Sequence, residues 1–347
     1  MKITIESNSG TFDFACEADE RMLYSGLVQG LSLPYECATG TCGTCRGRVT
    51  SGSAHVEWQD APGYAKLRRE KGDILMCQAR PTGDCTLRIP AKIAPHAKPE
   101  TLPAHRTGRI ENLRRLVHDV IDFDLVLSAP MTFDAGQFVV LEVPGIAGGR
   151  AYSMVNHVRA TSTLKLVIKQ KPEGKFSDWL FGSDVTGREL NVFGPLGRAT
   201  YDPAEGRNIL CIAGGSGIAG MLAIIAHAIR DGALRERTAH VFFGVRTLDD
   251  AFYMSEFAAF AAAAGTNLDV TLALSHAPAD TATHPQFPAI RLASGMVTDV
   301  AARAMTGRTD NTVAFVAGPP VMVDIALKHL THEAKIPRAF IRYDKFA

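Results

Sequence analysis

Four of the seven cysteines are spaced in a way that restricts how the N-terminal part of the chain can fold. Three stand close together, Cys37, Cys42 and Cys45, and the fourth, Cys77, follows far downstream. Only glycine, alanine and threonine separate the first three, in the loop CATGTCGTC. A loop of such small residues can wrap tightly, so that its thiols and a distant fourth thiol face one compact centre. The odd cysteine count and this clustering argue against a secreted disulfide scaffold.

A Cys-x4-Cys-x2-Cys loop with a distant fourth cysteine is the spacing of a plant-type [2Fe–2S] cluster. Small loop residues let backbone N–H groups approach and hydrogen-bond the cluster sulfurs. A structural zinc site is a weaker alternative, because it usually pairs two short Cys/His motifs and the fourth cysteine has no such neighbour. We therefore expect four iron ligands, Cys37, Cys42, Cys45 and Cys77. Buried cysteines are often merely structural, which is our interpretation of Cys16, Cys85 and Cys211.

The pattern of strands and helices changes twice along the 347 residues, which predicts a multidomain chain with three domains. Residues 1–92 carry the cysteine loop, and a proline-containing linker follows at 93–104. Residues 105–204 contain short strands separated by Gly and Pro turns, as in an antiparallel β-barrel. Residues 205–347 alternate strand and helix, which is typical of an α/β domain with a parallel sheet.

Charge and hydropathy limit the choice of partners. The formal net charge of +1 gives no electrostatic case for nucleic acid. Residues 209–229 lack Asp, Glu, Lys and Arg and are long enough to span a bilayer. Three closely spaced glycines inside this stretch instead favour a buried strand, a loop and a buried helix, so we expect no membrane contact. The N-terminal sequence lacks the regions of a signal peptide, which favours a cytoplasmic protein.

Two short motifs have residue types suited to nucleotide cofactors. Arg150-Ala151-Tyr152-Ser153 follows the strand-like segment GQFVVLEVPG and offers a cation for phosphate, an aromatic ring for stacking and a hydroxyl. The second motif lies between a buried strand and a helix, where glycines let the backbone approach phosphates and the helix dipole favours their charge. It consists of Gly214, Gly215, Ser216 and Gly217. This is not the dinucleotide fingerprint G-x-G-x-x-G, so the motif alone is inconclusive.

The motifs together resemble those of the ferredoxin–NADP reductase superfamily with an N-terminal plant-type ferredoxin domain. The similarity covers the whole chain and rests on PYECATGTCGTC, LMCQAR, RAYS, GGSG and AGPP. A DAPG segment, LVIK and a C-terminal YDKF point further to the reductase components of multicomponent diiron, toluene-type monooxygenases. The resemblance implies a β-grasp fold for the first domain.

The resemblance also implies a flavin site. Arg150 would meet the phosphate side, Tyr152 would lie against the isoalloxazine, and Ser153 would reach the reactive N5 edge. A ferredoxin-first domain order resembles FAD rather than FMN reductases. A glycine turn that leads into a helix suits the diphosphate. The further flavin-site residues are Ala151, Asn156, Val167, Ile168, Lys169, Gly174, Lys175, Phe176 and Ser177. A solvated lysine at a strand edge is the alternative for the lysine of LVIK.

For the nucleotide domain, the resemblance implies a pyridine-nucleotide site in which further contacts follow later strands. These contacts are Gly244, Arg246, Gly318 and Pro319. The chain departs from the family at Gly220, where many members have Pro, and at Ala317, where a Cys often stands. The segment GVRTLDD holds one Arg and two acids, Asp249 and Asp250. An acid suits a ribose hydroxyl and a 2′-phosphate would need several cations, so we expect NADH.

The C-terminal YDKF segment could place the aromatic ring of Phe346 near the flavin. Asp344 could assist there with charge or protons.

These observations predict an NADH:acceptor oxidoreductase that uses NADH, FAD and a [2Fe–2S] cluster, in that order. The flavin must lie between the other two, because hydride carries two electrons and the cluster accepts one. The expected acceptor is an oxygenase or ferredoxin component, in particular a diiron monooxygenase of aromatic or alkene hydrocarbons. Charges beside the cluster loop, Glu36, Arg46 and Arg48, could steer docking. The reductase of a Rieske-type dioxygenase and a redox-sensing flavoprotein remain alternatives.

Overall fold

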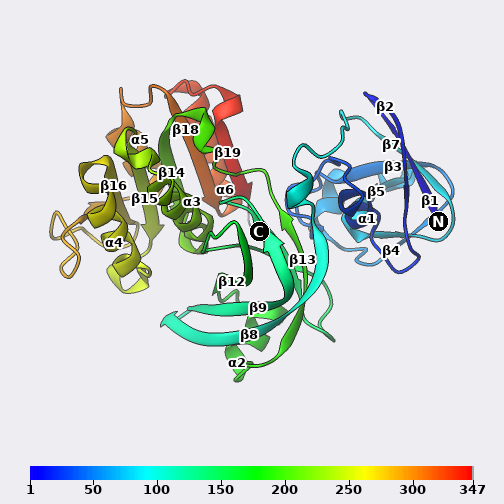
Figure 1. The fold of residues 1–347 in the computed structure, drawn as a ribbon, viewed down its shortest axis with the longest axis horizontal. Helices are drawn as coiled ribbons and strands as arrows, with labels where there is room; N and C mark the ends of the chain where they lie inside the picture. Colours follow the sequence, from blue (N-terminus) through cyan, green and yellow to red (C-terminus); the bar gives the residue numbers. More distant parts are fainter. Residues whose placement is uncertain (346–347) are drawn as a thin grey trace. The chain divides into compact units, whose positions relative to one another are not determined.

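The structure is a computed structural model that describes residues 1–345 (Figure 1). Backbone packing divides the chain into two compact units. One unit joins Met1–Arg106 with two later segments, Val140–Ala151 and Asn191–Leu196. The other contains the remaining residues. The strands of the expected barrel therefore contribute to both units.

The N-terminal domain is built on a mixed five-stranded sheet. In sheet order the strands are β2 (Gly10–Ala15), β1 (Lys2–Ser7), β7 (Cys85–Ile89), β3 (Arg46–Ser51) and β5 (Asp73–Leu75). Strands β1 and β2 form an antiparallel hairpin, whereas β1 runs parallel to β7. One helix, α1 (Met22–Val28), packs beside the sheet, and a ribbon pairs β4 (Ala54–Val56) with β6 (Ala79–Pro81). This is the expected β-grasp arrangement.

The linker after this domain is packed rather than free. Ser32 N–H donates to the Ala94 carbonyl over 2.8 Å, and His96 N–H donates to the Gly30 carbonyl over 2.7 Å. Ile93 is buried. The proline content predicted a spacer, but apolar and backbone contacts attach it to the loop after α1.

The middle domain contains a six-stranded, barrel-like sheet. Its order is β11 (Arg150–Ser153), β10 (Phe138–Glu142), β13 (Glu189–Leu196), β8 (Ala104–Val117), β9 (Val120–Thr132) and β12 (Ala160–Lys169). Strands β8, β9 and β12 pair antiparallel and bury alternate side chains such as Phe123, Leu125 and Leu166. The helix α2 (Lys175–Gly182) follows β12 after a glycine turn.

The C-terminal domain is a parallel six-stranded sheet covered by helices on both faces (Figure 1). Its order is β17 (Ile290–Ser294), β16 (Leu268–Leu274), β15 (Ala239–Val245), β14 (Asn208–Gly214), β18 (Thr312–Gly318) and β19 (Ile341–Lys345). Its helices are α3 (Ile218–Arg230), α4 (Met254–Ala264), α5 (Val297–Met305) and α6 (Pro320–His332). The strand order reverses at β14, and a crevice at such a switch point is where open α/β sheets bind ligands.

The apolar stretch 209–229 is buried in this domain. Ile209 and Cys211 of β14 face the core shared with α3 and α4, whereas Leu210 and Ile212 face the core shared with α5 and α6. Burial on both faces accounts for the unbroken hydropathy of a parallel strand. Among the described residues, every helix is too short or too polar to cross a membrane.

Candidate functional site

The cluster loop brings the four predicted cysteine thiols together. Cys37 Sγ lies 3.2 Å from Cys42 Sγ, and Cys45 Sγ lies 3.2 Å from Cys77 Sγ. Cys42 is partly exposed and the other three are buried. The remaining cysteines, Cys16, Cys85 and Cys211, are buried free thiols elsewhere, and burial raises the pKa of each.

Backbone N–H groups of the loop point at its sulfurs. Thr39 N–H and Cys42 N–H each approach Cys37 Sγ to 3.4 Å, and Thr44 N–H approaches Cys42 Sγ to 3.4 Å. The contact between the two thiols lowers the pKa of Cys37, with help from the loop donors, and raises the pKa of Cys42, so the pair holds one proton between them. Thiolate is the form that binds iron. Four convergent thiols with amide donors fit a [2Fe–2S] cluster, for which Cys37, Cys42, Cys45 and Cys77 would be the ligands.

A buried tyrosine and arginine support this loop from behind. Ala38 has a left-handed backbone with φ of 57°, which is uncommon for alanine, and the Tyr24 hydroxyl donates to its carbonyl over 3.0 Å. Arg21 Nη1 donates to the Tyr24 hydroxyl over 3.3 Å and pairs with Glu142 Oε1 at 2.5 Å. Arg21 also pairs with Glu57 at 2.6 Å.

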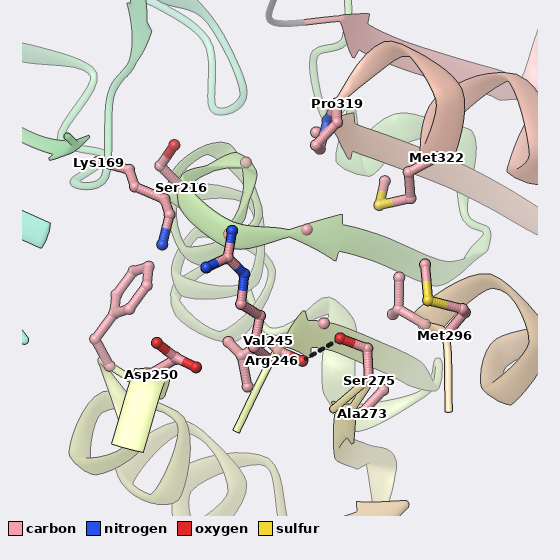
Figure 2. Close-up of a pocket in the computed structure, with 17 residues that line it drawn as sticks. Lys169, Ser216, Val245, Arg246, Asp250, Ala273, Ser275, Met296, Pro319 and Met322 are labelled. Atoms are coloured by element: carbon pink, nitrogen blue, oxygen red, sulfur yellow. Dashed lines mark hydrogen bonds between the residues drawn. The ribbon is translucent and has the colours of Figure 1, made fainter. Parts of the chain in front are cut away.

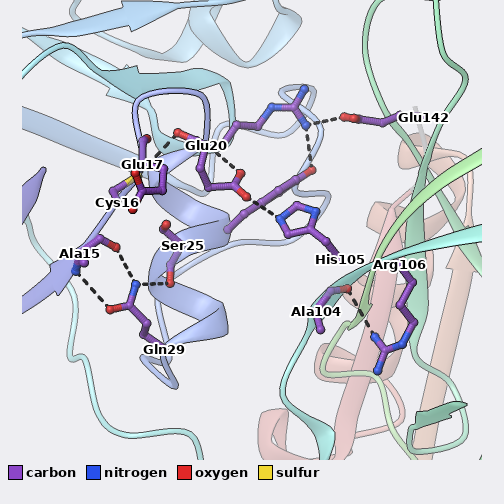
Figure 3. Close-up of polar contacts among 12 residues, drawn as sticks. Ala15, Cys16, Glu17, Glu20, Ser25, Gln29, Ala104, His105, Arg106 and Glu142 are labelled. Carbon is purple, nitrogen blue, oxygen red and sulfur yellow. Dashed lines mark hydrogen bonds and ion pairs between the residues drawn. The ribbon is translucent and has the colours of Figure 1, made fainter. Parts of the chain in front are cut away.

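Further contacts reinforce this junction with the β10 and β13 segments of the same compact unit. His105 Nε2 lies 2.5 Å from Glu20 Oε2 (Figure 3). The rings of Tyr24 and Phe193 stack at 3.9 Å with an interplanar angle of 10°. The cluster loop therefore depends on Tyr24, which is itself held by residues of the middle domain.

The RAYS motif forms β11, as its position after β10 suggested. Arg150, Ala151 and Tyr152 are half-buried and Ser153 is buried. The Tyr152 ring lies 5.3 Å from the ring of Phe176 in α2. A half-buried guanidinium, an aromatic ring and a hydroxyl thus follow one strand, which fits the residue types that a flavin nucleotide requires.

The turn at Gly174 brings the second flavin segment to the start of α2. Ser177 Oγ accepts from Lys171 N–H at 3.1 Å and bonds the Gly174 carbonyl at 2.9 Å, which closes the turn. A Cβ at Gly174 would lie 2.9 Å from the Lys171 carbonyl oxygen, so a larger residue would force the turn to shift. Lys175 is the first residue of α2. The turn leaves the first N–H groups of α2 available to an anion.

The other residues expected at the flavin have different surroundings. Asn156 holds its loop against β12, through Nδ2 to the Thr163 carbonyl at 2.9 Å and Oδ1 to Lys165 N–H at 2.7 Å. Val167 and Ile168 are core residues. Asp344 lies in β19 opposite Ala317, and Phe346 lies outside the described residues.

A cavity of about 320 Å³ lies at the carboxyl ends of the parallel strands (Figure 2). It is lined by every residue of the GGSG motif and by the predicted coenzyme contacts that follow the later strands. Those residues are Gly214, Gly215, Ser216, Gly217, Gly244, Arg246, Gly318 and Pro319. The residues predicted from the sequence to contact the coenzyme thus line one cavity, and their contact with it stays a prediction.

Two glycines here are required by close packing. A Cβ at Gly217 would lie 2.5 Å from the Ala317 carbonyl oxygen, and a Cβ at Gly244 would lie 2.8 Å from Val297 Cβ. The loop thus packs tightly against β18 and leads directly into α3. Backbone N–H groups and the positive end of α3 fit the diphosphate of a dinucleotide.

Charged side chains line one side of this pocket. Lys169, expected at the flavin, lines the nucleotide pocket and pairs with Asp119 at 2.6 Å. Asp250 also lines it, and its Oδ2 accepts from Thr247 N–H at 2.9 Å. Although burial raises the pKa of Asp250, the hydrogen bonds from Thr247 outweigh it and the pKa is lowered. Asp249 lines a separate cavity beside Arg114.

Sequence reasoning missed the apolar wall of the pocket. Ser275 follows β16, and its Oγ donates to the Val245 carbonyl at 3.2 Å (Figure 2). The other unpredicted lining residues are Val245, Phe252, Ala273, Met296, Val297 and Met322. The sequence could have indicated Ser275, because the segment LALS ends a strand and the carboxyl ends of parallel strands meet at one edge of the sheet.

The flavin motif and the nucleotide loop meet at the start of α3. A Cβ at Gly220 would lie 3.7 Å from Ser153 Cβ and 3.7 Å from Gly136 Cα. Only the missing side chain of Gly220 thus separates Ser153 from the helix that begins at the GGSG loop. Three sites of this kind on one chain define a pyridine-nucleotide oxidoreductase that uses flavin and an iron–sulfur cluster.

Three family models match the chain in this order. Residues 5–82 match the 2Fe-2S iron-sulfur cluster binding domain, residues 107–201 the oxidoreductase FAD-binding domain, and residues 211–328 the oxidoreductase NAD-binding domain. The chain therefore carries [2Fe–2S], FAD and NAD sites.

Relatives align with this chain over nearly its entire length. The chain is 34% identical over 337 residues to the alkene monooxygenase system ferredoxin–NAD(+) reductase component of Xanthobacter autotrophicus, covering 96% of this chain and 97% of the relative. It is 32% identical over 336 residues to the ferredoxin–NAD(P)(+) reductase CarAd of Metapseudomonas resinovorans, covering 95% and 96%. The solved ferredoxin reductase in carbazole 1,9a-dioxygenase is 29% identical, with a TM-score of 0.82 and coverage of 100% and 99%. The chain belongs to the family of ferredoxin–NAD(P)+ reductases with an N-terminal [2Fe–2S] domain.

Proposed function

We propose that this chain transfers electrons from NADH to the oxygenase component of a diiron monooxygenase that acts on aromatic or alkene hydrocarbons. The single observation that supports the reductase reaction best is the cavity in which the GGSG loop meets the ends of the later strands, with α3 running beside Ser153. Relatives named for alkene and xylene/toluene monooxygenase systems support the partner class. The cytoplasm is the proposed location, because all seven cysteines are free thiols and a reducing compartment keeps thiols unpaired.

The residues of the chain position the two nucleotides for hydride transfer. When bound, NADH supplies a hydride, FAD accepts its two electrons, and the cluster carries them away singly. The GGSG loop and α3 would hold the diphosphate of the coenzyme. Ser153, buried beside Gly220, would present its hydroxyl at the junction, where it can donate or accept a hydrogen bond.

Electrons would leave through the partly exposed face of the cluster loop. Cys42 is the least buried of the four thiols, and Thr44 beside it is exposed. An electron acceptor can approach the loop at this face because electron transfer requires closeness. The other three thiols face the protein interior.

The proposed preference for NADH rests on the charges of the nucleotide pocket. Asp250 lines it together with Arg246 and Lys169, and the lysine is neutralised by Asp119. A 2′-phosphate would meet one unneutralised cation and one carboxylate, which disfavours NADPH. The comparison is kcat/KM for NADH and NADPH at one salt concentration. Equal values, or higher values with NADPH, would contradict the proposal.

A second partner class has direct support, because the reductase in carbazole 1,9a-dioxygenase covers the entire chain. Reconstitution distinguishes the two. The purified protein would be combined with NADH and either a diiron hydroxylase from an alkene or toluene system or a Rieske oxygenase. We expect faster NADH-dependent product formation with the diiron hydroxylase. Turnover with the Rieske oxygenase alone would assign the chain to the second class.

A further inference from the structure

A strongly basic segment lies beside the cluster loop. Residues 62–71, PGYAKLRREK, form two short 3-10 helices, η1 (Pro62–Lys66) and η2 (Arg69–Lys71). The segment carries two lysines, two arginines and one glutamate. The whole chain is nearly neutral, with 37 basic and 36 acidic residues. The segment therefore carries a net charge of +3 in a chain whose total is +1.

Backbone contacts attach the segment to the cluster loop. Gly63 N–H donates to the Gly40 carbonyl over 2.9 Å. A Cβ at Gly63 would lie 2.7 Å from the Gly40 oxygen and 2.9 Å from Gly43 N, so the two backbones are in direct contact. Lys66 Nζ donates to the carbonyl of Cys42 over 3.0 Å. The Lys66 ammonium thus bonds the backbone of Cys42, which is a predicted iron ligand.

The charged ends of this segment remain accessible. The basic rim, as we call it, consists of exposed residues: Arg46, Lys66, Arg68, Arg69 and Lys71. Arg46 follows Cys45 directly in sequence. The Arg69 guanidinium lies over the Tyr64 ring at 4.8 Å, which fixes its direction. Arg48 differs from the rim, because it pairs with the buried carboxylate of Asp73 at 2.7 Å.

We propose that the basic rim is the docking surface for an acidic protein that accepts electrons from the cluster. This inference rests on the proposed function and adds the location and the sign of the docking charge. A rim with a net positive charge beside the exposed face of Cys42 attracts a partner of opposite charge and orients it over the loop. Exposed charges are screened by salt, so docking weakens as ionic strength rises.

Two haem proteins of opposite charge test the sign. Cytochrome b5 is an acidic one-electron acceptor, cytochrome c is a basic one, and benzoquinone is a neutral small acceptor. With NADH at low ionic strength, neutralising the rim should lower kcat/KM for cytochrome b5 about ten-fold and flatten its salt dependence. It should raise kcat/KM for cytochrome c and leave benzoquinone reduction unchanged. The variant combines Arg46→Gln, Arg68→Gln, Arg69→Gln and Lys71→Gln and keeps Lys66, which bonds the carbonyl of Cys42.

A matched control removes the same charge elsewhere. Four exposed residues of the nucleotide domain, none of which lines its pocket, serve for this. The control combines Arg235→Gln, Arg303→Gln, Lys328→Gln and Arg338→Gln. A second rim variant, Arg68→Glu with Lys71→Glu, leaves the contacts of Lys66 and Arg69 in place, and it should reproduce the effect with an intact visible cluster spectrum.

The outcomes separate the two proposals. If the rim variants and the control change cytochrome b5 reduction equally, or if both haem proteins respond in the same direction, the rim is not the docking surface. If the unmodified protein reduces neither haem protein nor benzoquinone with NADH, the proposed reductase function itself is wrong.

Discussion

The cluster loop and the nucleotide pocket differ in how far apart in the sequence their residues lie. Three of the four cluster thiols come from nine consecutive residues, and the loop's own N–H groups point at the sulfurs. The nucleotide pocket instead gathers residues from strand ends spread from Lys169 to Met322. A covalently bound inorganic group needs a short, tightly wrapped loop, whereas a long dinucleotide needs the edge of a sheet. The first site depends on single side chains and the second on backbone packing.

That difference predicts that one ligand change abolishes the cluster. Cys77→Ser should remove or severely destabilise it, because the thiolate at 3.2 Å from Cys45 Sγ has no substitute nearby. Iron content and visible absorbance measure the loss, and about two irons per chain are expected before the change. Cys85→Ser is the matched control, since Cys85 is a buried thiol of β7. A cluster that survives Cys77→Ser but not Cys85→Ser would refute the ligand set.

The nucleotide pocket should respond to a change of backbone packing. Gly217→Ala places a methyl 2.5 Å from the Ala317 oxygen, so the loop must move away from β18. We expect a loss of about 1–3 kcal/mol in unfolding free energy and a raised KM for NADH. Thermal denaturation and steady-state kinetics measure both. Gly182→Ala, where a Cβ has nothing within 4 Å, should change neither. An unchanged KM in Gly217→Ala would show that the loop does not position the coenzyme.

A smaller effect is expected behind the cluster loop. Tyr24→Phe removes the hydroxyl that donates to the Ala38 carbonyl, so this carbonyl loses a hydrogen bond. We expect a loss of about 1 kcal/mol in unfolding free energy. Because Ala38 has a left-handed backbone, its loss of support should alter the electron paramagnetic resonance and circular dichroism of the cluster. Tyr201→Phe, a buried tyrosine of the other compact unit, should leave both spectra unchanged. If Tyr24→Phe has the same spectra as the unmodified protein, Tyr24 does not support the cluster loop.

A pH dependence is expected at the far end of α3. His157 Nε2 bonds the Phe133 carbonyl at 3.1 Å, and Nδ1 faces Arg230 at 2.8 Å. Burial, then the neighbouring His227 and Arg230, lowers the pKa of His157 to about 4.

Below its ordinary pKa of about 6.5, the unfolded chain binds this proton and the folded chain does not. Stability from this site is therefore complete above about pH 6.5 and declines as pH falls towards 4. The unfolding free energies of the protein and of His157→Gln would be measured across that range. The difference between them should become smaller as the pH falls from 6.5 towards 4. A constant difference would contradict the assignment.

Sequence and structure agree best where a site is local. The four cysteines were predicted as one group because their spacing already describes the loop, and the structure brings their thiols together. The nucleotide pocket was predicted only at its glycines. Ser275 and Met296 were missed because their place depends on how β16 and α5 converge with distant strands. Lys169, expected at the flavin, lines the nucleotide pocket and its ammonium pairs with Asp119, so its contact with the flavin stays a prediction.

The central claim is that electrons enter at the flavin and leave through the cluster. A cluster-less Cys42→Ser variant that retains FAD tests it most directly. With NADH, this variant should reduce ferricyanide at the normal rate, because ferricyanide can take electrons at the flavin. It should reduce cytochrome c poorly and fail to support an oxygenase. Oxygenase turnover at the normal rate in the cluster-less variant would show that the cluster is not the exit and would contradict the account.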